Sequence, residues 1–332
     1  MILLLFLGIV QGIDLSYGEY KAKYSKVVPS HEEAYRANLY NKRVREVNIH
    51  NSLGYSWKSG LNQFTDRSPS EFKQILGNKV QLRQSDGKSS LKTMKPLKAT
   101  PDKFDWRDSG TVTPVKNQGM CGSCWAFSAA ESIESQYMIQ TGKLIELSEQ
   151  EILDCTNIPG AGGCAGGTEQ YAYQMIMERK GLSGEWTYPY TSFFGEAGYC
   201  NKTRSKPLVN VHGYEELSIN DYDALVGGLI LNGPISISVD ATDWDAYESG
   251  IFNGCNKTAI DINHAVQLVG VGVDASGVGY WIIRNSWGAN WGEDGYIRLI
   301  REGNYTCAPI VGSKSEACGP CGILYSGLYP LI

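Results

Sequence analysis

Residues 118–128 constrain this chain most, because they place two cysteines three positions apart directly before a helical pattern. The string reads Gln-Gly-Met-Cys-Gly-Ser-Cys-Trp-Ala-Phe-Ser, and its cysteines are Cys121 and Cys124. Apolar residues recur at helical spacings up to Tyr137, and Gly142 then acts as a stop signal, which predicts a buried helix of about four turns. Cys124 would lie at the N-terminus of that helix, where free N–H groups and the helix dipole lower the pKa of a thiol.

A Cys-x-x-Cys pair alone has three interpretations: a redox pair, half of a zinc site, or one disulfide cysteine beside one reactive cysteine. A zinc site needs a second pair of ligands, which Cys318 and Cys321 could supply, and the residues around Pro320 do not decide this. A thioredoxin-like pair needs a preceding strand, and residues 111–118 are short and polar for that.

The five residues from Cys121 to Trp125 fit the nucleophile segment of papain-like cysteine peptidases, C-G-[SA]-C-[WY], at every position. The chain therefore resembles that family. The resemblance implies that Cys124 is the nucleophile. It also implies that the Gln118 side chain, six residues earlier, forms an oxyanion hole together with the backbone N–H of Cys124.

The chain has four histidines, and the resemblance selects one of them as the general base. His31 and His50 lie in the N-terminal region, and His212, in Val-His-Gly-Tyr, is interpreted as structural or exposed. His264 begins the string His-Ala-Val-Gln-Leu-Val-Gly-Val-Gly, which resembles the histidine strand of the family. We therefore expect His264 to be the catalytic acid and base.

A third signature covers residues 281–296, Trp-Ile-Ile-Arg-Asn-Ser-Trp-Gly followed by Trp-Gly-Glu-Asp-Gly-Tyr. The resemblance implies that Asn285 orients His264 and that Trp287 shields this hydrogen bond from water. His264 and Asn285 follow Cys124 by about 140 and 160 residues, near the roughly 130–150 of the papain group; we attribute the longer separation to loop insertions. This chemistry requires no metal or organic cofactor.

Residues 19–76 are charged and contain no cysteine, which marks them as a separate helical domain. Residues that recur every three to four positions predict one stripe of a long helix: Glu32, Arg36, Tyr40, Arg43, Val47 and Asn51. The stripe resembles the interspersed motif of cathepsin L-type pro-segments, with Arg43 in place of an Asn, and a second motif matches at Gly60, Asn62, Phe64 and Asp66. The resemblance implies an intramolecular inhibitor that runs backwards through the catalytic cleft.

Local signals divide the rest of the N-terminal region. Residues 60–66 alternate like a short strand and then turn, and Ser68-Pro69-Ser70-Glu71 is typical of a helix start. Residues 77–99 are rich in Lys, Ser and Gln, which predicts an extended, protease-accessible linker. We expect the mature enzyme to begin near Thr100 and to extend over residues 100–332.

The first residues indicate secretion. Ile2–Val10 is an apolar run too short to span a bilayer, and with the small residue Gly12 after it the run is typical of a signal peptide over residues 1–12, ending at the latest at 18. A truncated gene model and a buried strand are the alternatives. Three glycosylation sequons, at Asn201, Asn256 and Asn304, agree with secretion. The expected location is a lysosome or vacuole, or the extracellular space.

Nine cysteines predict four disulfides and one free thiol in an oxidising compartment. Sequence alone permits 105 pairings of eight cysteines, so the assignment rests on the resemblance. It implies the pairs Cys121–Cys164, Cys155–Cys200, Cys255–Cys321 and Cys307–Cys318, the last across an extra loop. The pairing of Cys255 with Cys318 stays open as an alternative.

The implied fold class is α+β, with a helical left domain over residues 100–207 and an antiparallel, barrel-like right domain over residues 208–332. Apolar runs predict strands at Ile235–Val239, Val266–Val273 and Tyr280–Arg284. The cleft would lie between the domains, with Cys124 on one wall and His264 on the other, since a domain interface is a usual place for such a site.

The resemblance also implies a set of substrate-binding residues. A strip that binds substrate backbone would contain Gly166 and Gly167, Trp287 would flank the site, and the specificity pocket would be lined by Thr168, Glu169, Ser238, Ile262, Ala265 and Ser326. Glu169 stands where relatives often have an apolar residue, so we expect tolerance of polar or basic side chains. Asn263 replaces a frequent Asp before the histidine, which predicts a shifted pH profile.

Taken together, the catalytic and substrate-binding residues that the resemblance implies predict an endopeptidase that acts on polypeptides. We expect a monomer, and we expect cystatin-type proteins to inhibit it. No paired-histidine insertion like the occluding loop of cathepsin B is present. The net charge of −5 without basic blocks disfavours nucleic acid as a partner. The alternatives from other classes are a catalytically silent scaffold with a binding or storage role, and a cysteine-rich metal-binding protein, for which the histidines are too few.

Overall fold

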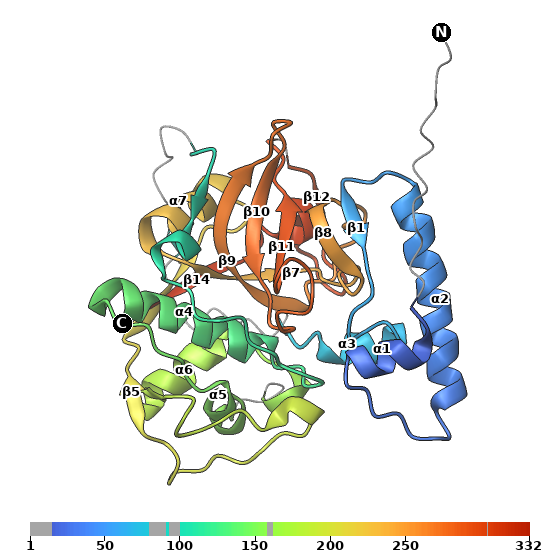
Figure 1. Cartoon of the computed structure of the whole chain (residues 1–332). Helices are drawn as coiled ribbons and strands as arrows, with labels where there is room; N and C mark the ends of the chain where they lie inside the picture. Colours follow the sequence, from blue (N-terminus) through green and yellow to red (C-terminus); the bar gives the residue numbers. More distant parts are fainter. Residues whose placement is uncertain (1–14, 80–90, 93–99, 158–161, 304) are drawn as a thin grey trace, which may run out of the picture.

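The computed structural model describes residues 15–79, 91–92, 100–157, 162–303 and 305–332. The expected signal peptide, most of the expected linker, and the sequon residue Asn304 lie outside these residues. A slender helical unit formed by residues before 80 lies beside a larger mixed body formed by residues from 100 onward (Figure 1). Within the described ranges, no helix has both the length and the apolar character needed to cross a bilayer.

The smaller unit consists of the elements α1 (Tyr17–Lys23), α2 (Glu33–Ser52), β1 (Trp57–Ser59) and α3 (Pro69–Ile75). Both short helices begin with a capping box, which satisfies backbone N–H groups that a helix start leaves free. Ser16 and Glu19 form the box of α1, and Ser68 and Glu71 form the box of α3. The helix start predicted at Ser68 is therefore confirmed.

The long helix α2 buries three residues of the predicted stripe, namely Arg36, Tyr40 and Val47. Tyr40 is buried, and its ring centroid lies 4.9 Å from that of Tyr20 in α1. Arg36 forms ion pairs with Glu32 one turn earlier, at 2.7 Å, and with Glu71 of α3, at 2.6 Å. These contacts join the three helices of the unit into one body.

The strand of this unit lies earlier than predicted. We expected a strand within residues 60–66, but the structure places β1 at Trp57–Ser59, antiparallel to β8 (Tyr247–Phe252) of the larger body. Residues 60–66 form a turn instead, in which the Asn62 side chain accepts a bond from Phe64 N at 2.9 Å, and Asn62 N donates to Thr65 Oγ1 at 2.9 Å. Such local side-chain bonds compete with a strand ladder.

One half of the larger body is helical, with α4 (Cys124–Thr141), α5 (Glu149–Cys155) and α6 (Glu169–Arg179), and with the short strand pair β4 (Leu182–Ser183) and β5 (Pro207–Val209). Helix α4 is the predicted one, since it begins at Cys124 and ends at Gly142 in the left-handed conformation that glycine favours. The residues of α4 from Cys124 to Gln136 are all buried, so this helix runs through the interior.

The other half is built on a sheet, whose strands are β3 (Phe104–Asp105), β6 (Gly213–Leu217), β7 (Ile235–Val239), β8, β9 (His264–Val273), β10 (Gly279–Arg284), β11 (Tyr296–Ile300) and β14 (Gly327–Leu331), beside helix α7 (Tyr222–Asn232). The three strands predicted from apolar runs are confirmed as β7, β9 and β10. A smaller hairpin, β12 (Cys307–Pro309) and β13 (Glu316–Cys318), lies apart from the sheet.

The order in the sheet is β1-β8-β11-β10-β9-β7-β14-β6-β2, and β3 pairs with β9. Most neighbours are antiparallel, whereas β8 with β11 and β2 (Leu91–Lys92) with β6 are parallel. In the described residues no ladder joins β1 to β2, so the sheet is open and not a closed barrel. The fold class is α+β, as expected.

The apolar core continues across the boundary between the two bodies. Phe64 and Phe72 of the smaller unit belong to the same buried cluster as Trp287 of the larger body. Each of the two phenylalanine rings meets the Trp287 ring edge-on, with centroids 5.3 Å apart. Apolar burial of this kind stabilises by roughly 25 cal/mol per Å², so these aromatic side chains help to hold the smaller unit to the body, together with the ladder between β1 and β8.

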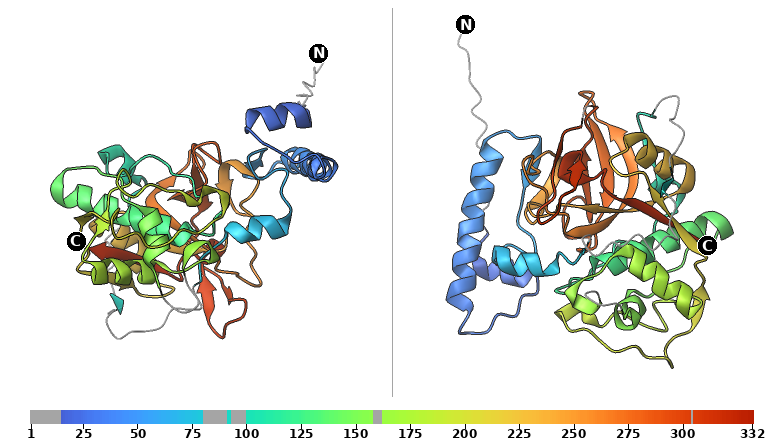
Figure 2. Two further views of the ribbon diagram at one scale, coloured as in Figure 1. Left: turned by 90° about the horizontal axis from the view of Figure 1, so that it is seen from below. Right: turned by 180° about the vertical axis from the view of Figure 1, so that it is seen from behind.

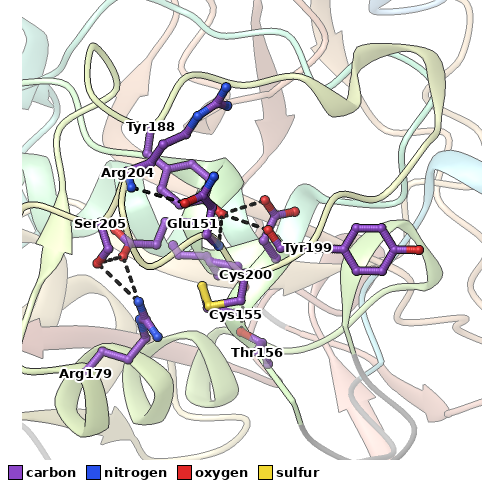
Figure 3. The surroundings of a disulfide bond; sticks show 12 residues. Glu151, Cys155, Thr156, Arg179, Tyr188, Tyr199, Cys200, Arg204 and Ser205 are labelled. Carbon is purple, nitrogen blue, oxygen red and sulfur yellow. Dashed lines mark hydrogen bonds and ion pairs between the residues drawn. A yellow bond between two sulfur atoms is a disulfide. The ribbon is translucent and has the colours of Figure 1, made fainter.

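The structure contains the disulfides Cys121–Cys164, Cys155–Cys200, Cys255–Cys321 and Cys307–Cys318. Figure 3 shows the second of them beside a polar cluster, in which Arg179 contacts Glu151 at 3.5 Å and donates to Ser205 Oγ at 3.1 Å. Cys318 and Cys321 each belong to a disulfide, so they are not the second half of a zinc site.

Candidate active site

The candidate nucleophile is fixed by a helix and a disulfide together. Cys124 is the first residue of α4, is fully buried, and is the one cysteine of the nine outside a disulfide. Three residues earlier, Cys121 is bonded to Cys164, which ties this loop to the loop before α6. The thiol therefore lies at the start of a helix, and the loop that leads into this helix is fixed by a disulfide.

A hydrogen bond and contacts with two tryptophan rings hold His264 at the start of β9. Its Nε2 lies 2.8 Å from Asn285 Oδ1, and its ring stacks on Trp287 with centroids 4.7 Å apart. Asn285 Oδ1 also accepts a bond from Ser286 N at 2.8 Å, which identifies this atom as the oxygen. In the neutral ring the proton therefore lies on Nε2, and the Nδ1 lone pair is free to accept a proton.

Gln118 is completely buried, and its amide is held from both ends. Its Oε1 accepts a bond from Ser286 Oγ at 2.7 Å, and its Nε2 donates to Cys121 O at 2.7 Å. The same Nε2 donates to the carbonyl of Ile75, at 2.9 Å, and Ile75 belongs to the smaller unit. The side chain predicted to form the oxyanion hole therefore donates to a carbonyl of the N-terminal segment.

The sequence did not indicate Tyr190, whose hydroxyl contacts the loop between Gln118 and Cys124. The Tyr190 hydroxyl donates to Gln118 O at 2.8 Å and lies 2.9 Å from Ser123 Oγ. It thereby links the residue that carries the amide donor to the residue directly before Cys124. Its only sequence signal is a tyrosine after a proline, which does not distinguish it from an ordinary turn residue.

Residues 77–79 cross the site and hydrogen-bond to both halves of the body. Gly167 N donates to Gly77 O at 2.9 Å, and Lys79 N donates to Gly167 O at 2.8 Å. On the other side, Asn78 N donates to Asn263 O at 2.9 Å. The bridge between Asn78 and Gly167 is parallel, and the segment covers Cys124 and His264 from solvent.

The pKa of Cys124 differs from the sequence prediction. The helix start predicted a lowered pKa, but burial in this structure raises the pKa of Cys124 to about 12, although backbone N–H groups of Ala265 and Gly77 oppose the rise. Burial likewise lowers the pKa of His264 to about 4, although the hydrogen bond that His264 donates to Asn285 opposes this fall. Burial in this site therefore disfavours the thiolate of Cys124 and the imidazolium of His264.

Two of the predicted substrate-binding residues have no space for a side chain. A Cβ on Gly166 would lie 2.3 Å from Gly77 O, and a Cβ on Gly167 would lie 2.8 Å from the Trp125 ring. This close approach lets the backbone of Gly167 pair with the crossing segment, and it would let the same backbone pair with a peptide.

The structure brings most of the predicted pocket residues together. Ser238 donates to Glu169 Oε1 at 3.5 Å, pairs with Ala265 across β7 and β9, and donates from its backbone to Ser326 O at 3.3 Å. The Thr168 hydroxyl instead caps α6. Ile262 is buried in a small apolar cluster beside the β12–β13 hairpin, and Trp287 lies on His264.

The family follows from a comparison of the sequence with protein-family models. Residues 100–318 match the model described as papain family cysteine protease. The chain belongs to the papain family of cysteine proteases. Residues 17–72 match the model described as cathepsin propeptide inhibitor domain (I29), so this papain-family chain carries its inhibitor as an N-terminal pro-segment.

Named relatives support the same assignment over nearly the whole chain. Pro-cathepsin H of Bos taurus is 38% identical over 88% of this chain and 86% of its own length. Procathepsin L of Rattus norvegicus is 36% identical, and the match covers 90% of each chain. The structure of a recombinant stem bromelain precursor matches with a TM-score of 0.81, at 35% identity, over 95% of this chain and 97% of the other. These matches support a cysteine protease zymogen of the papain family and not a silent scaffold.

Proposed function

We propose that the processed chain is an endopeptidase that cleaves peptide bonds through a thioester on Cys124. The thiolate attacks the substrate carbonyl carbon, and the oxyanion accepts bonds from the Gln118 amide and a backbone N–H. The imidazolium of His264 gives its proton to the leaving amine. Water then attacks the thioester, His264 accepts a proton from this water, and the acid product leaves as the thiolate is restored.

The observation that carries this proposal is the way in which the pro-segment occupies the site. The Ile75 carbonyl sits on Gln118 Nε2, where the proposal puts the substrate oxyanion. The backbone N–H of Gly77 is directed at the Cys124 sulfur. An inhibitory segment that covers one thiol and one amide donor is expected where those two groups perform the chemistry.

Activation follows from the same contacts. A cut near Thr100, after the proposed linker 77–99, would release the proposed pro-domain 19–76 and readmit water to the site. Burial raises the pKa of Cys124 and lowers the pKa of His264, so uncovering both groups reverses both shifts. A thiolate beside an imidazolium then becomes the stable pair, with Asn285 orienting the ring.

The proposed specificity pocket combines Glu169 with Ser238, Ala265 and Ser326, and it favours polar or basic side chains in the substrate. Glu169 is the first residue of α6 and is completely buried in the zymogen. A carboxylate in such a wall attracts a cation once the pro-segment has left. A peptide library in which only Leu and Phe are accepted at this subsite would refute the preference.

Location and partners are part of the proposal. Four disulfides support passage through an oxidising compartment, so we assign the enzyme to the secretory pathway, in a lysosome or vacuole or outside the cell. Asn201 and Asn256 are exposed, and each accepts a bond from the threonine two residues on, which suits glycosylation. A glycosidase should therefore reduce the mass of the natural protein.

The processed enzyme is proposed to act as a monomer, because one chain supplies the catalytic residues and their inhibitor. Once the pro-segment has left, the open cleft should accept cystatin-type inhibitors. Light scattering before and after addition of a cystatin, with residual activity measured on the same samples, tests both statements.

The deciding experiment measures hydrolysis of a fluorogenic dipeptide-amide panel by acid-treated, reduced protein, with and without an epoxide that alkylates thiols. We expect hydrolysis that the epoxide abolishes, one adduct on Cys124, and loss of mass up to about residue 100. Cys124→Ser is the matched control, and it should take no adduct. A folded, processed protein that neither turns over substrate nor takes the adduct would refute the proposal.

A further inference from the structure

The hairpin β12–β13 lies outside the main sheet and is closed by the Cys307–Cys318 disulfide. It projects from the larger body as a separate two-stranded ribbon, drawn in orange-red in the left view of Figure 2. The sequence marks it as an extra loop relative to the resemblance, and the proposed catalytic chemistry does not use it.

One face of the hairpin is buried, in the alternation that a strand requires. Ala308, Ile310 and Ala317 are buried, while Pro309 and Glu316 between them are exposed. The buried face packs on Ile260 and Ile262, which with the three hairpin residues form a separate apolar cluster. A hairpin with one apolar face that covers two isoleucines is a packing element and not a free surface loop.

Gly322 shows how close this packing is. A Cβ on Gly322 would lie 2.6 Å from Ile262 Cδ1 and 3.0 Å from both Ala317 Cβ and Ile260 Cγ2. The side chains that meet here therefore leave no room for a methyl group. A change of volume in the cluster would be transmitted to Ile262, because closely packed interiors pass strain on.

Hydrogen bonds from the backbone of Ile260 and from the side chain of Asn220 hold the two strands of the hairpin. Ile260 N donates to Pro309 O, and Val311 N donates to Ile260 O, both at 2.9 Å. On the other strand, the Asn220 side chain donates to Glu316 O at 3.0 Å and accepts from Cys318 N at 2.9 Å. The hairpin is thus fixed to the body on one side and to the 260 segment on the other.

The residues 260–263, called the 260 segment, contact the hairpin on one side and the pro-segment in the cleft on the other. Asn263 O accepts a bond from Asn78 of the pro-segment at 2.9 Å, and Asp261 lies 3.6 Å from Lys73 Nζ. In the described structure this segment has no helix or strand of its own, and its bridge at Ile260 is to the hairpin. His264 follows directly as the first residue of β9.

One predicted pocket residue belongs to this cluster, and the neighbour of another packs against it. Ile262, which the resemblance places in the pocket wall, is the member, and Tyr325, next to the predicted pocket residue Ser326, is the neighbour. We propose that the β12–β13 hairpin is a specificity-determining brace, which sets the position of the Ile262 wall of the substrate pocket through the 260 segment. This inference rests on the proposed function.

The test compares processed enzymes whose active sites have been titrated with the epoxide, so that a loss of folded protein does not alter the result. The main variant is Ile310→Ala, in the buried face, and the matched control is Val311→Ala, whose side chain is 58% exposed on the same hairpin. The readout is the ratio of kcat/KM for a substrate with a large apolar side chain in the pocket to kcat/KM for one with a small polar side chain.

We expect Ile310→Ala to change this ratio by at least about fivefold and Val311→Ala to change it by less than about twofold. A merely structural role would lower the titratable fraction and leave the ratio unchanged. If Ile310→Ala does not fold, Ile310→Val and the double variant Cys307→Ser with Cys318→Ser take its place, each expected to change the ratio by about twofold or more.

Unchanged ratios in every folded variant, with an active wild type, would overturn the brace and leave the proposed function intact. A wild-type protein that neither hydrolyses the panel nor reacts with the epoxide would overturn the proposed function and the brace together. The two failures are therefore distinguished by the wild-type sample alone.

Discussion

The clearest prediction concerns Gly77, the residue of the pro-segment that lies over the nucleophile loop. An ideal Cβ at this position would be 1.9 Å from the carbonyl oxygen of Gly122, whereas real Cβ atoms essentially never approach within 3.0 Å. Gly122 cannot retreat easily, because the neighbouring Cys121 is bonded to Cys164. Gly77→Ala should therefore lift the pro-segment away from the site by at least about 1 Å, the difference between these two distances.

Such a shift breaks hydrogen bonds of 2.8–2.9 Å that seal the site. They run from Gly167 N to Gly77 O, from Lys79 N to Gly167 O, and from Gln118 Nε2 to Ile75 O. Each contributes about 1 kcal/mol, so their joint loss would weaken inhibition by about 3 kcal/mol, or roughly 100-fold.

The assay follows adduct formation between the intact zymogen and the epoxide at neutral pH, by mass spectrometry. We expect Gly77→Ala to react roughly 100-fold faster than wild type, because the rate reports the fraction with an uncovered thiol. Gly18→Ala is the matched control, since its Cβ would have no neighbour closer than 4.0 Å and it lies in the same pro-segment. Equal rates for wild type and Gly77→Ala would refute the reasoning.

Three other perturbations test separate parts of the structure. Asn285→Ala removes the acceptor that orients His264. A hydrogen bond from an imidazolium contributes about 1.5–3 kcal/mol. The value of kcat per titrated site should therefore fall roughly 10–150-fold, with little change in KM. Glu71→Gln tests the acid response of the zymogen: burial raises the pKa of Glu71, but Arg36 and Ser68 outweigh it and lower the pKa from 4.5 to about 2. The ion pair therefore stabilises the fold above about pH 4.5 and is lost as pH falls toward 2. The melting temperature of the wild type should drop over that window, and that of Glu71→Gln should start lower and drop less; parallel curves would contradict the assignment. Cys124 of the zymogen should react with iodoacetamide faster as pH rises toward 12, because burial raises the pKa of Cys124 to about 12. The processed enzyme, in contrast, should react readily at pH 6. Similar pH profiles for the two forms would be inconsistent with a thiol that the pro-segment covers.

Sequence patterns predicted those features that depend on neighbouring residues in the chain. The start of α3 at Ser68 follows from a capping box four residues long, and the end of α4 follows from the conformational freedom of Gly142. The strand β9 after His264 follows from an unbroken apolar run. In each of these cases the physical cause lies within a few residues of the feature.

Features that depend on distant residues could not be predicted in this way. The strand at Trp57 exists because it pairs with Gly250 in β8, and no local pattern specifies that partner. Arg43, which stands in place of an expected Asn, forms an ion pair with Asp245 across the interface. The raised pKa of Cys124 likewise results from its complete burial by residues distant in the chain, which outweighs the effect of the helix start that the sequence makes visible.

The sheet order has a consequence for the processed enzyme. Its two outermost strands, β1 and β2, both precede Thr100, and they pair with β8 at one end and with β6 at the other. The proposed cut near Thr100 would therefore remove both end strands at once and leave unpaired N–H and C=O groups along β8 and β6. Exposed edges of this kind can accept a strand from another chain. Loss of the pro-segment would thus replace the edge strands β1 and β2 with β8 and β6, and amide hydrogen exchange in β8 and β6 should become faster.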